Sequence, residues 1–347
     1  MPSVLTEPHM LWSHNGKTVV GKGELLRFDP GVGASRYRRA LEALSETGRQ
    51  LAFASFTFDP SEPGSVVIVP EEIESSVPHG DVNGSGVPRS HLVFDGVSAW
   101  RDGFRGALEA IDESKVAKVV LTRQVALQFD TRIPLMEIAH RLRTAQTDCY
   151  TFLVDGLIGA SPELLVSLHD GIIASLALAG TAPNAESLGS EKMDLEHLLA
   201  AASVREGISR HVTELAPPTR SVLEFGDIKH LATRFQGPAI EGATVLDVLE
   251  TLHPTASVAG TPTETSLQLI REIEPRRRGR YAGPVGWFTA NGEGEFALAL
   301  RCGQVHGNEI TLFAGGGIVN GSDTDSEFAE TELKLQPMLR ALGVDRR

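Results

Sequence analysis

The chain has 347 residues, enough to bury a large core, and its length favours two domains or one large one. The composition is ordinary for a globular protein, but 45 acidic side chains against 32 basic ones give a formal net charge of -13. Such a field repels phosphate backbones and anionic membranes, so we expect neither as a partner, despite the basic run at 276–280. An anionic substrate would need a metal ion or a few placed cations.

The cysteines and the first residues exclude further classes. Cys149 and Cys302 stand far apart and form no CxxC pair, so neither a disulfide framework nor a cysteine-ligated zinc site is supported. The opening residues lack the basic and apolar regions of a secretion signal, and no stretch is long and apolar enough to span a bilayer. We therefore expect a cytoplasmic protein.

The first hundred residues are expected to form strands and turns with one helix. Residues 17–28 alternate and residues 35–50 have a helical period, while 50–58 and 64–70 have the composition of strands. The segment 70–90, rich in Pro, Gly and Ser, is either a domain boundary or a surface excursion. We favour the excursion, because the preceding strands are too few to close a core of their own.

From about residue 100, strands interrupted by helices replace any regular βαβ alternation. In chain order we expect a helix at 100–114, a strand at 118–127, a helix at 134–145, strands at 149–156, 157–171 and 172–181, a helix at 193–215, strands in 221–235 and 281–319, and a last helix that carries 326–335. The turn sequences ANGEGE and HGNE indicate hairpins, so much of the sheet should be antiparallel. The pattern predicts an α+β fold.

No generic short motif identifies the chemistry. The glycine-rich segment 31–35 lacks the lysine of a P-loop, and the glycines at 315–317 lack GxGxxG spacing. HExxH, GxSxG and EF-hand patterns are absent from the sequence as well. The informative residues are instead charged side chains in places where charge is expensive.

Lys118 and Glu163 are the first two of these residues. Lys118 opens an apolar run, so it is either a strand-end lysine that reaches water or a desolvated lysine able to act as a base. Glu163 follows Pro162 and is either a strand-edge carboxylate or an acid kept protonated by apolar neighbours. Taken alone, each residue is explained by the simpler interpretation.

Glu196 lies in the long predicted helix. It is followed on the same helix face by Ala200, Ser203 and Gly207. This stripe of small residues is typical of close helix packing, and it would also leave room for an ion beside the carboxylate.

The last helix carries Glu327, Glu330 and Lys334 on one face, at i, i+3 and i+7. Thr324 with Glu327 fits a capping box, and Glu330 with Lys334 fits an exposed ion pair, so a solvated surface would explain all three. The same face could instead form one wall of a site. Glu332 points elsewhere, and we expect charge reversal there to do little to ligand binding at such a site, in contrast to the same change at Lys334.

Together these residues favour a site over separate surface features. A cluster of carboxylates without His or Cys suits Mg2+, which commonly binds one or two carboxylates plus oxygens of the substrate. A lysine and a glutamate available as base and acid would complete a site for proton transfer. The residues thus indicate a Mg2+-assisted acid–base enzyme that acts on an anion.

At these residues the chain resembles the chorismate-utilising enzymes and, within them, the isochorismate synthases. The resemblance runs in order from about residue 96 to 344. Its segments are KVVLTR, GASPELL, LALAGT, DLEH, HLAT, LHPTASVAG, GRYAGPVGW, ALALRCG, LFAGGGIV and EFAETELKL. Residues 1–95 resemble the family's more variable N-terminal part.

The resemblance implies a fold and a ligand. It implies a single chorismate-binding domain over 1–347, in which two large antiparallel sheets pack together with helices outside them and 96–344 form the catalytic core. It also implies a buried site for chorismate with Mg2+. An acidic protein would then bind a dianion through one metal and a few cations.

The resemblance also implies a reaction and its catalytic groups. Isochorismate synthases add water at C2 of chorismate while the C4 hydroxyl leaves and the double bonds shift. By position, Lys118 is similar to the general base and Glu163 to the general acid, so both side chains would be neutral at one pH. Glu196 and Glu330 are similar to the family's Mg2+ ligands, with Glu327 holding a metal-bound water.

The remaining matched positions resemble substrate contacts. Arg301 and Lys334 are similar to the cations that bind the substrate's carboxylates, helped by the backbone N–H near Gly315. Arginine offers a bidentate fork that lysine lacks, so Arg301→Lys should not be conservative. The pocket around the ring and its hydroxyls is similar to the family's at Gly180, Thr181, His230, Ser257 and Val258.

Lys118 also separates branches of the family. Anthranilate and aminodeoxychorismate synthases use ammonia, usually from a glutamine amidotransferase partner, and lack this lysine, so its presence favours water and no such partner. Ala179 stands where some aminodeoxychorismate synthases carry a nucleophilic lysine, which disfavours covalent catalysis. No oligomerisation helix is evident, and we expect a monomer.

Two alternatives stay open. A salicylate synthase would go on to eliminate pyruvate from isochorismate in the same site. His253 and Pro254 are more similar to the isochorismate synthases, whereas Ser257 replaces an alanine found in many of them and leaves lyase activity open. A relative that binds chorismate without catalysis is the second alternative, and the joint presence of base, acid and metal ligands argues against it. The isochorismate would serve a catecholate siderophore, menaquinone or salicylate.

Overall fold

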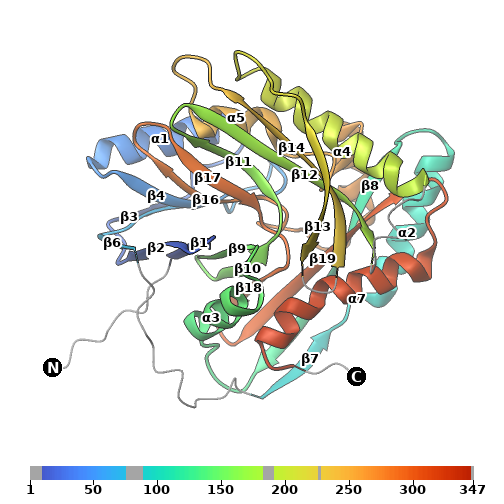
Figure 1. The fold of residues 1–347 in the computed structure, drawn as a ribbon. Coiled ribbons are helices and arrows are strands. Elements are labelled where there is room, and N and C mark those ends of the chain that lie inside the picture. Colours follow the sequence, from blue (N-terminus) through green and yellow to red (C-terminus); the bar gives the residue numbers. More distant parts are fainter. Residues whose placement is uncertain (1–9, 76–88, 183–190, 226–227, 345–347) are drawn as a thin grey trace.

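The computed structural model of the protein describes residues 10–75, 89–182, 191–225 and 228–344 (Figure 1). Two large antiparallel sheets pack together, and helices lie outside them. This is the α+β fold that the sequence predicts. No helix in the described ranges is both long and apolar enough to cross a membrane.

The first sheet has ten strands. They are β1 (Met10–His14), β2 (Lys17–Lys22), β6 (Glu72–Glu74), β7 (Ser90–Phe94), β8 (Lys118–Phe129), β9 (Tyr150–Val154), β10 (Leu157–Ser161), β15 (Gly260–Thr261), β18 (Cys302–His306) and β19 (Glu309–Val319). Their order is β15-β8-β19-β18-β10-β9-β1-β2-β6, with β7 paired to β8. The pairing of β19 with β8 ends where Val319 lies opposite Lys118, so the glycines of β19 run beside the strand of this lysine.

The second sheet has nine strands. They are β3 (Leu26–Phe28), β4 (Leu51–Ser55), β5 (Val66–Val69), β11 (Leu164–His169), β12 (Ile172–Ala182), β13 (Thr219–Phe225), β14 (Ile228–Pro238), β16 (Pro284–Thr289) and β17 (Gly294–Leu298). Their order is β13-β14-β12-β11-β17-β16-β4-β5-β3. Strands from the first 95 residues extend both sheets, and residues 76–88 of the expected surface excursion lie outside the described residues.

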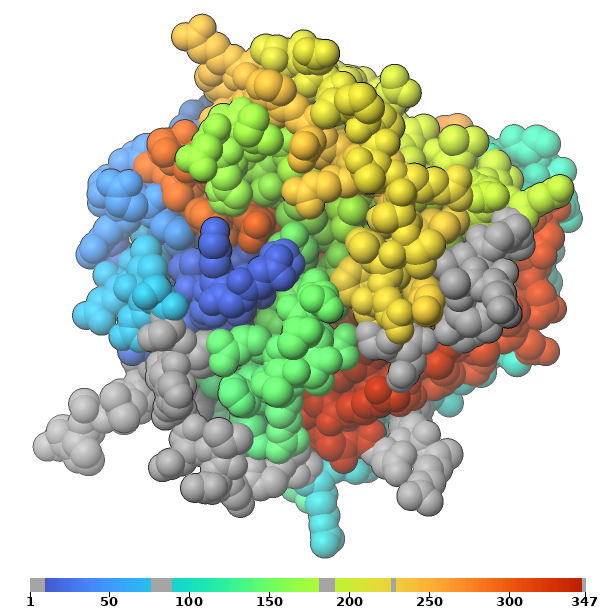
Figure 2. Space-filling view, in the orientation of Figure 1, coloured from blue at the N-terminus to red at the C-terminus, as the bar shows by residue number. Residues whose placement is uncertain are grey.

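The helices divide between the two sheets. They are α1 (Ser35–Thr47), α2 (Val97–Asp112), α3 (Leu135–Ala145), α4 (Glu191–Ser209), α5 (Val245–Leu252), α6 (Thr263–Ile273) and α7 (Thr324–Ala341). Helix α4 contacts β12 and β14, and α5 contacts β11, whereas α2 and α6 contact β8 and α7 contacts β19. Figure 2 shows α7 in red at the surface below the yellow residues of β13 and β14.

Six elements escape the sequence-based prediction: strands β1, β6, β7 and β15 and helices α5 and α6. Helix α5 has only eight residues, so its apolar face, formed by Val245, Leu246, Val248, Leu249 and Leu252, is too short to give a clear helical period in the sequence. Its start is nevertheless encoded locally, because Thr244 and Asp247 form a capping box. Helix α4 also ends at Ser209, earlier than the expected 215.

Two neighbouring chain segments pass from one sheet to the other. Strand β10 belongs to the first sheet and β11 to the second, and the expected single strand 157–171 is divided between them at Pro162 and Glu163. Strands β17 and β18 make the reverse passage at 299–301. The two segments stay paired through the passage, since Leu298 N donates to Glu163 O (3.1 Å) and Ala160 N to Arg301 O (3.2 Å).

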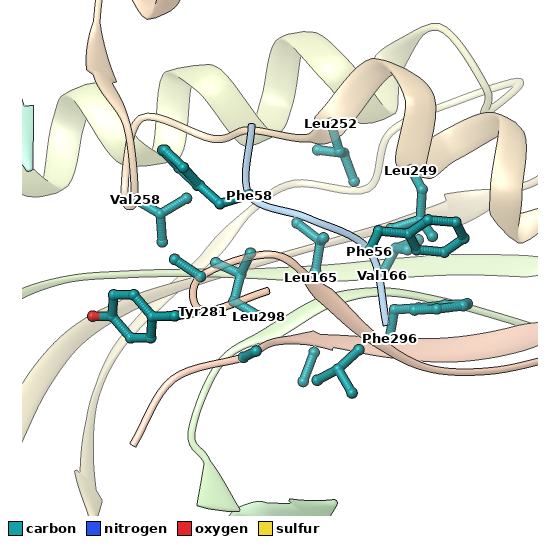
Figure 3. Packing of buried hydrophobic residues seen from close by; sticks show 14 of the residues in the cluster. Phe56, Phe58, Leu165, Val166, Leu249, Leu252, Val258, Tyr281, Phe296 and Leu298 are labelled. Atoms are coloured by element: carbon teal, nitrogen blue, oxygen red, sulfur yellow. The ribbon is translucent and has the colours of Figure 1, made fainter. Parts of the chain in front are cut away.

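The main core lies next to this passage. In Figure 3, Leu249 and Leu252 of α5 face Leu165 and Phe296 of the nine-stranded sheet. Tyr281 lies at the other end of the group with its hydroxyl pointing away from these residues (Figure 3). The core therefore ends in a side chain with a polar tip.

Candidate active site

Glu163 is held at the first passage between the sheets. Its side chain is buried, and its Oε1 accepts a hydrogen bond from Ser257 Oγ at 2.9 Å. Burial raises the pKa of Glu163 to about 7, although the hydrogen bond and the positive charges of Lys118 and Lys334 act in the opposite direction. A carboxyl with this pKa is partly protonated near neutral pH and can donate a proton.

Arg301 is held at the second passage. It has a positive φ of 48°, which is uncommon for a residue with a side chain, and it is buried. Its Nη2 lies 3.1 Å from His230 Nε2. Burial first, and then the charge of Arg301, hold the pKa of His230 well below its usual value. The imidazole is therefore neutral, and the buried guanidinium keeps its positive charge available to an anion.

Lys118 begins β8 and is fully buried. Its Nζ lies 3.1 Å from Glu196 Oε1 of α4. Burial would raise the pKa of Glu196, but the positive charges of Lys118 and Lys334 outweigh it and lower that pKa. Gly317 of β19 makes room for the pair, because a Cβ there would come 2.2 Å from Glu196 Oε1.

Helix α7 supplies one wall of the site. The helix is capped by Asp323, whose side chain accepts from Ser326 N, so the expected capping box of Thr324 and Glu327 is wrong by one residue. Glu327 is instead buried and accepts hydrogen bonds from Ser322 Oγ (3.1 Å) and Lys192 Nζ. The cap leaves this carboxylate free to face the site.

The next turn of α7 continues the wall. Lys334 Nζ lies 2.5 Å from Glu330 Oε1 and donates to Gly315 O at 2.8 Å. These side chains are 17% and 22% exposed, so the pair is mostly shielded from water rather than a solvated surface pair. The face of the helix with Glu327, Glu330 and Lys334 therefore turns toward β19 and the interior rather than forming a solvated surface.

These elements enclose one pocket of about 680 Å³ of empty space. Its lining includes Glu163, Gly180, Glu196, His230, Ser257, Val258, Arg301, Gly315 and Lys334. Lys118 lies behind Glu196, and Glu330 and Glu327 lie on the adjacent helix wall. Thr181 pairs with His230 in the β12–β14 ladder, and its side chain is outside the described part of the structure. The structure thus brings together the residues that the sequence scatters over more than 200 positions.

The stripe of small residues on α4 has a packing role. Ser203 Oγ accepts a hydrogen bond from Ala256 N at 3.1 Å. Gly207 faces Leu252 of α5 so closely that a Cβ would lie 2.9 Å from its Cδ2. The stripe therefore joins α4 to α5 and to the segment that carries Ser257.

The sequence-based prediction missed several residues of the pocket. Tyr281 and Phe313 form a stacked pair there, with ring centroids 4.8 Å apart and planes at 8°. Arg278 also lines the pocket, although the basic run that contains it suggested only a surface charge. Tyr281 lies in the segment GRYAGPVGW and Gly317 in LFAGGGIV, so the resemblance marked their positions without giving them a role.

The donor chemistry of this wall suits Mg2+. Glu196, Glu327 and Glu330 are close enough that burial and the negative charges of the other two raise the pKa of Glu327. Among the described residues, no three His, Cys, Asp or Glu side chains form a complete metal cage. A Mg2+ ion needs only one or two carboxylates when waters and substrate oxygens complete its shell, so the carboxylates present fit this ion.

The pocket combines a carboxyl with a raised pKa, Glu163, with a lysine shielded from water, Lys118. Two further cations, Arg301 and Lys334, lie in its lining. This combination is typical of an enzyme site that binds an anion. A model of the chorismate-binding enzyme family matches residues 89–343. The chain belongs to this family, which confirms the resemblance seen in its sequence.

Individual relatives agree with the family match. The chain is 36% identical over 264 residues to the isochorismate synthase MenF of Bacillus subtilis. The aligned region covers 72% of this chain and 56% of MenF. It is 31% identical over 343 residues to the isochorismate synthase DhbC of the same organism. This alignment covers 90% of this chain and 86% of DhbC. The alignment with MenF thus spans little more than half of that relative.

A solved structure supports the likeness over nearly the whole fold. A protein from Bacillus anthracis, described as a 2,3-dihydroxybenzoate-specific isochorismate synthase, DhbC, superposes with a TM-score of 0.89 at 28% identity. The match covers 99% of this chain and 98% of that one.

Glu332 has a structural role that its position in the sequence did not indicate. Its carboxylate bonds Arg123 Nη1, and Arg123 is buried with its guanidinium 4.4 Å from the ring of Phe328. This contact gives Glu332 a role in stability, and it leaves untested the expectation that a change at Glu332 does little to chorismate binding. The pair connects α7 to β8.

We expect Glu332→Gln to lower the free energy of unfolding by about 1–3 kcal/mol, because it leaves a buried guanidinium without its carboxylate. Urea denaturation measures this change. Asp325→Asn on the same helix is the control, since Asp325 and its partner Arg101 are 79% and 49% exposed and should contribute less than about 0.5 kcal/mol. Equal losses in the two variants would contradict the assignment.

Proposed function

We propose that the protein is an isochorismate synthase, an isomerase that converts chorismate to isochorismate. The proposal rests on one observation above all: Glu163 is buried in the lining of a pocket, and Lys118 is buried directly behind Glu196 of the same lining, in a chain whose relatives are isochorismate synthases. We also propose a single domain with the catalytic core at 96–344.

In the proposed mechanism, Lys118 takes a proton from water as the water oxygen bonds to C2 of chorismate. The ring double bonds shift and the C4–O bond breaks. Glu163 gives its proton to the departing hydroxyl, which leaves as water, so the substrate is isomerised without a net change in composition. The pKa of Glu163 near 7 supports its role, since a carboxyl at its usual pKa would hold almost no proton at neutral pH.

We propose that cations at two sides of the pocket hold the substrate. Arg301 would bind one carboxylate through its guanidinium, with the neutral His230 beside it, and Lys334 would bind the other near Gly315. Gly180, Ser257 and Val258 would line the ring, as would the backbone of Thr181. This arrangement concentrates positive charge locally in a protein of net charge -13.

We propose that Glu196 and Glu330 hold Mg2+, with Glu327 bound to one of its waters. When bound, the ion would neutralise the substrate's ring carboxylate. The three carboxylates and their mutual repulsion support this assignment. The lysine that activates water makes a glutamine amidotransferase unnecessary, and we propose that the protein acts as a monomer.

The proposed function is tested by incubating the purified protein with chorismate and Mg2+ and identifying the products by liquid chromatography. We expect isochorismate without pyruvate, and no reaction in EDTA. Glu163→Gln should abolish turnover and still bind chorismate in calorimetry, because the amide cannot donate the catalytic proton. Salicylate with pyruvate would indicate a salicylate synthase instead, and no turnover by the unaltered protein would contradict both.

Two neighbouring glycines give a matched test of the Lys118–Glu196 pair. A Cβ at Gly317 would collide with Glu196 Oε1 at 2.2 Å, whereas one at Gly316 would meet Glu327 Oε2 at 3.4 Å. We expect Gly317→Ala to lower kcat/KM by about tenfold to a hundredfold, since misplaced catalytic groups cost rate. The flexible side chains can move aside, so the melting temperature should change little. Gly316→Ala should retain most activity, and an equal loss in it would argue against the pair.

The pH dependence tests Glu163. As pH rises through about 7 the carboxyl loses its proton, so kcat/KM should fall on the alkaline side with the slope of one group. The bond from Ser257 favours the charged form, so Ser257→Ala should raise the pKa and move this limb up by about one pH unit. Ser203→Ala touches the same segment but not Glu163, and its limb should stay in place. If the alkaline limb of the kcat/KM profile does not move in Ser257→Ala, Glu163 is not the general acid.

A further inference from the structure

Each carboxylate proposed for the metal site is paired with a lysine of the chain itself. We name these six residues the carboxylate–lysine cluster: Glu196 with Lys118, Glu327 with Lys192, and Glu330 with Lys334. When Lys118 carries its proton, the three negative and three positive charges balance; it gives up that charge only in the form that acts as a base. A cation that enters the cluster must therefore displace an ammonium group, because the carboxylates already have counter-ions.

Lys192 differs from the other two lysines in what it contacts. It lies in the first turn of α4 and reaches across to Glu327 of α7. Its ammonium group therefore occupies a position beside Glu327 that a cation bound to this carboxylate would need.

Lys192 is also the lysine best able to leave. Its side chain is 30% exposed, compared with 0% for Lys118 and 17% for Lys334. Lys334 is held in addition by the carbonyl of Gly315. A long, partly exposed lysine side chain can turn its ammonium group into water at little cost, whereas a fully buried one cannot.

We propose that Lys192 is the resident cation of the site and that Mg2+ binds by displacing it from Glu327. The inference rests on the proposed metal site of the proposed function. Lys192 thereby weakens the binding of Mg2+ and holds α4 and α7 together when the ion is absent. It is a positioning residue, since it acts through Glu327 rather than on the substrate.

The test is a calorimetric titration of the full chain with Mg2+ alone, without chorismate. Lys192→Met keeps most of the apolar stem and removes the charge, so we expect Mg2+ to bind about tenfold more tightly, because it no longer competes with a tethered ammonium. Lys22→Met is the matched control, since Lys22 pairs with Glu74 at a similar exposure of 32% but outside the cluster. The control should bind Mg2+ as the unaltered protein does.

Thermal unfolding gives a second readout. Without Mg2+, Lys192→Met should melt below the unaltered protein, because Glu327 loses its partner, and saturating Mg2+ should raise its melting temperature by more than that of the unaltered protein. Lys192→Gln, which can still donate a hydrogen bond to Glu327, serves if the methionine variant does not fold. Unchanged or weaker Mg2+ binding in the variant, or no saturable binding in any of the proteins, overturns the proposal.

The outcomes separate this proposal from the proposed function. The Mg2+ titration contains no substrate, so it does not depend on turnover. If the unaltered protein makes isochorismate while Lys192→Met binds Mg2+ no more tightly, the role of Lys192 fails and the function stands. Tighter Mg2+ binding in a variant of a protein that makes no isochorismate would support Lys192 and contradict the function.

Discussion

The site depends on one constraint, the paired passage of two chain segments from the first sheet to the second. Because β10–β11 and β18–β17 remain hydrogen-bonded as they pass, neither segment can shift without the other. Glu163 and Arg301 sit on these two segments and point into the space that opens where the sheets separate. The proposed acid and the proposed anion-binding cation are thereby fixed relative to each other by backbone bonds, which is more rigid than placement on two independent loops.

Charge is arranged around this frame in opposed pairs. The interior carries lysines and arginines in a chain of net charge -13, and most of them face a carboxylate. Such pairs offset part of the cost of burying each ion. Glu163 is the exception, since its nearest partner is the neutral hydroxyl of Ser257, and this difference explains why its pKa rises while that of Glu196 falls. Burial, pairing and the charges nearby together set the direction of each shift, since the pKa of Glu327 also rises although it is paired with Lys192.

The sequence allowed the fold class and most strands to be predicted, because hydrophobic periodicity is a local signal, and several of the proposed site residues line one pocket. It could not show that 157–171 changes sheets at Pro162, since both halves are equally apolar. It also placed the cap of α7 one residue late and missed the tie between Glu332 and Arg123, because a helical spacing does not reveal which strand lies beneath the helix. Contacts between distant segments decide such points.

Arg278 is another residue whose contacts with distant segments the sequence does not show. It links the part of the site around Lys118 to the part around Glu163. In the sequence it belongs to a basic run, but its guanidinium is buried and donates to Val120 O (2.6 Å) and Val258 O (2.8 Å). Glu274 balances its charge and accepts from Thr122 N at 2.8 Å. The Arg278–Glu274 ion pair thus joins β8, which begins with Lys118, to the segment that carries Ser257, the hydrogen-bond partner of Glu163. The spacing of Lys118 and Glu163 therefore depends on a buried side chain that directly follows two exposed arginines, Arg276 and Arg277.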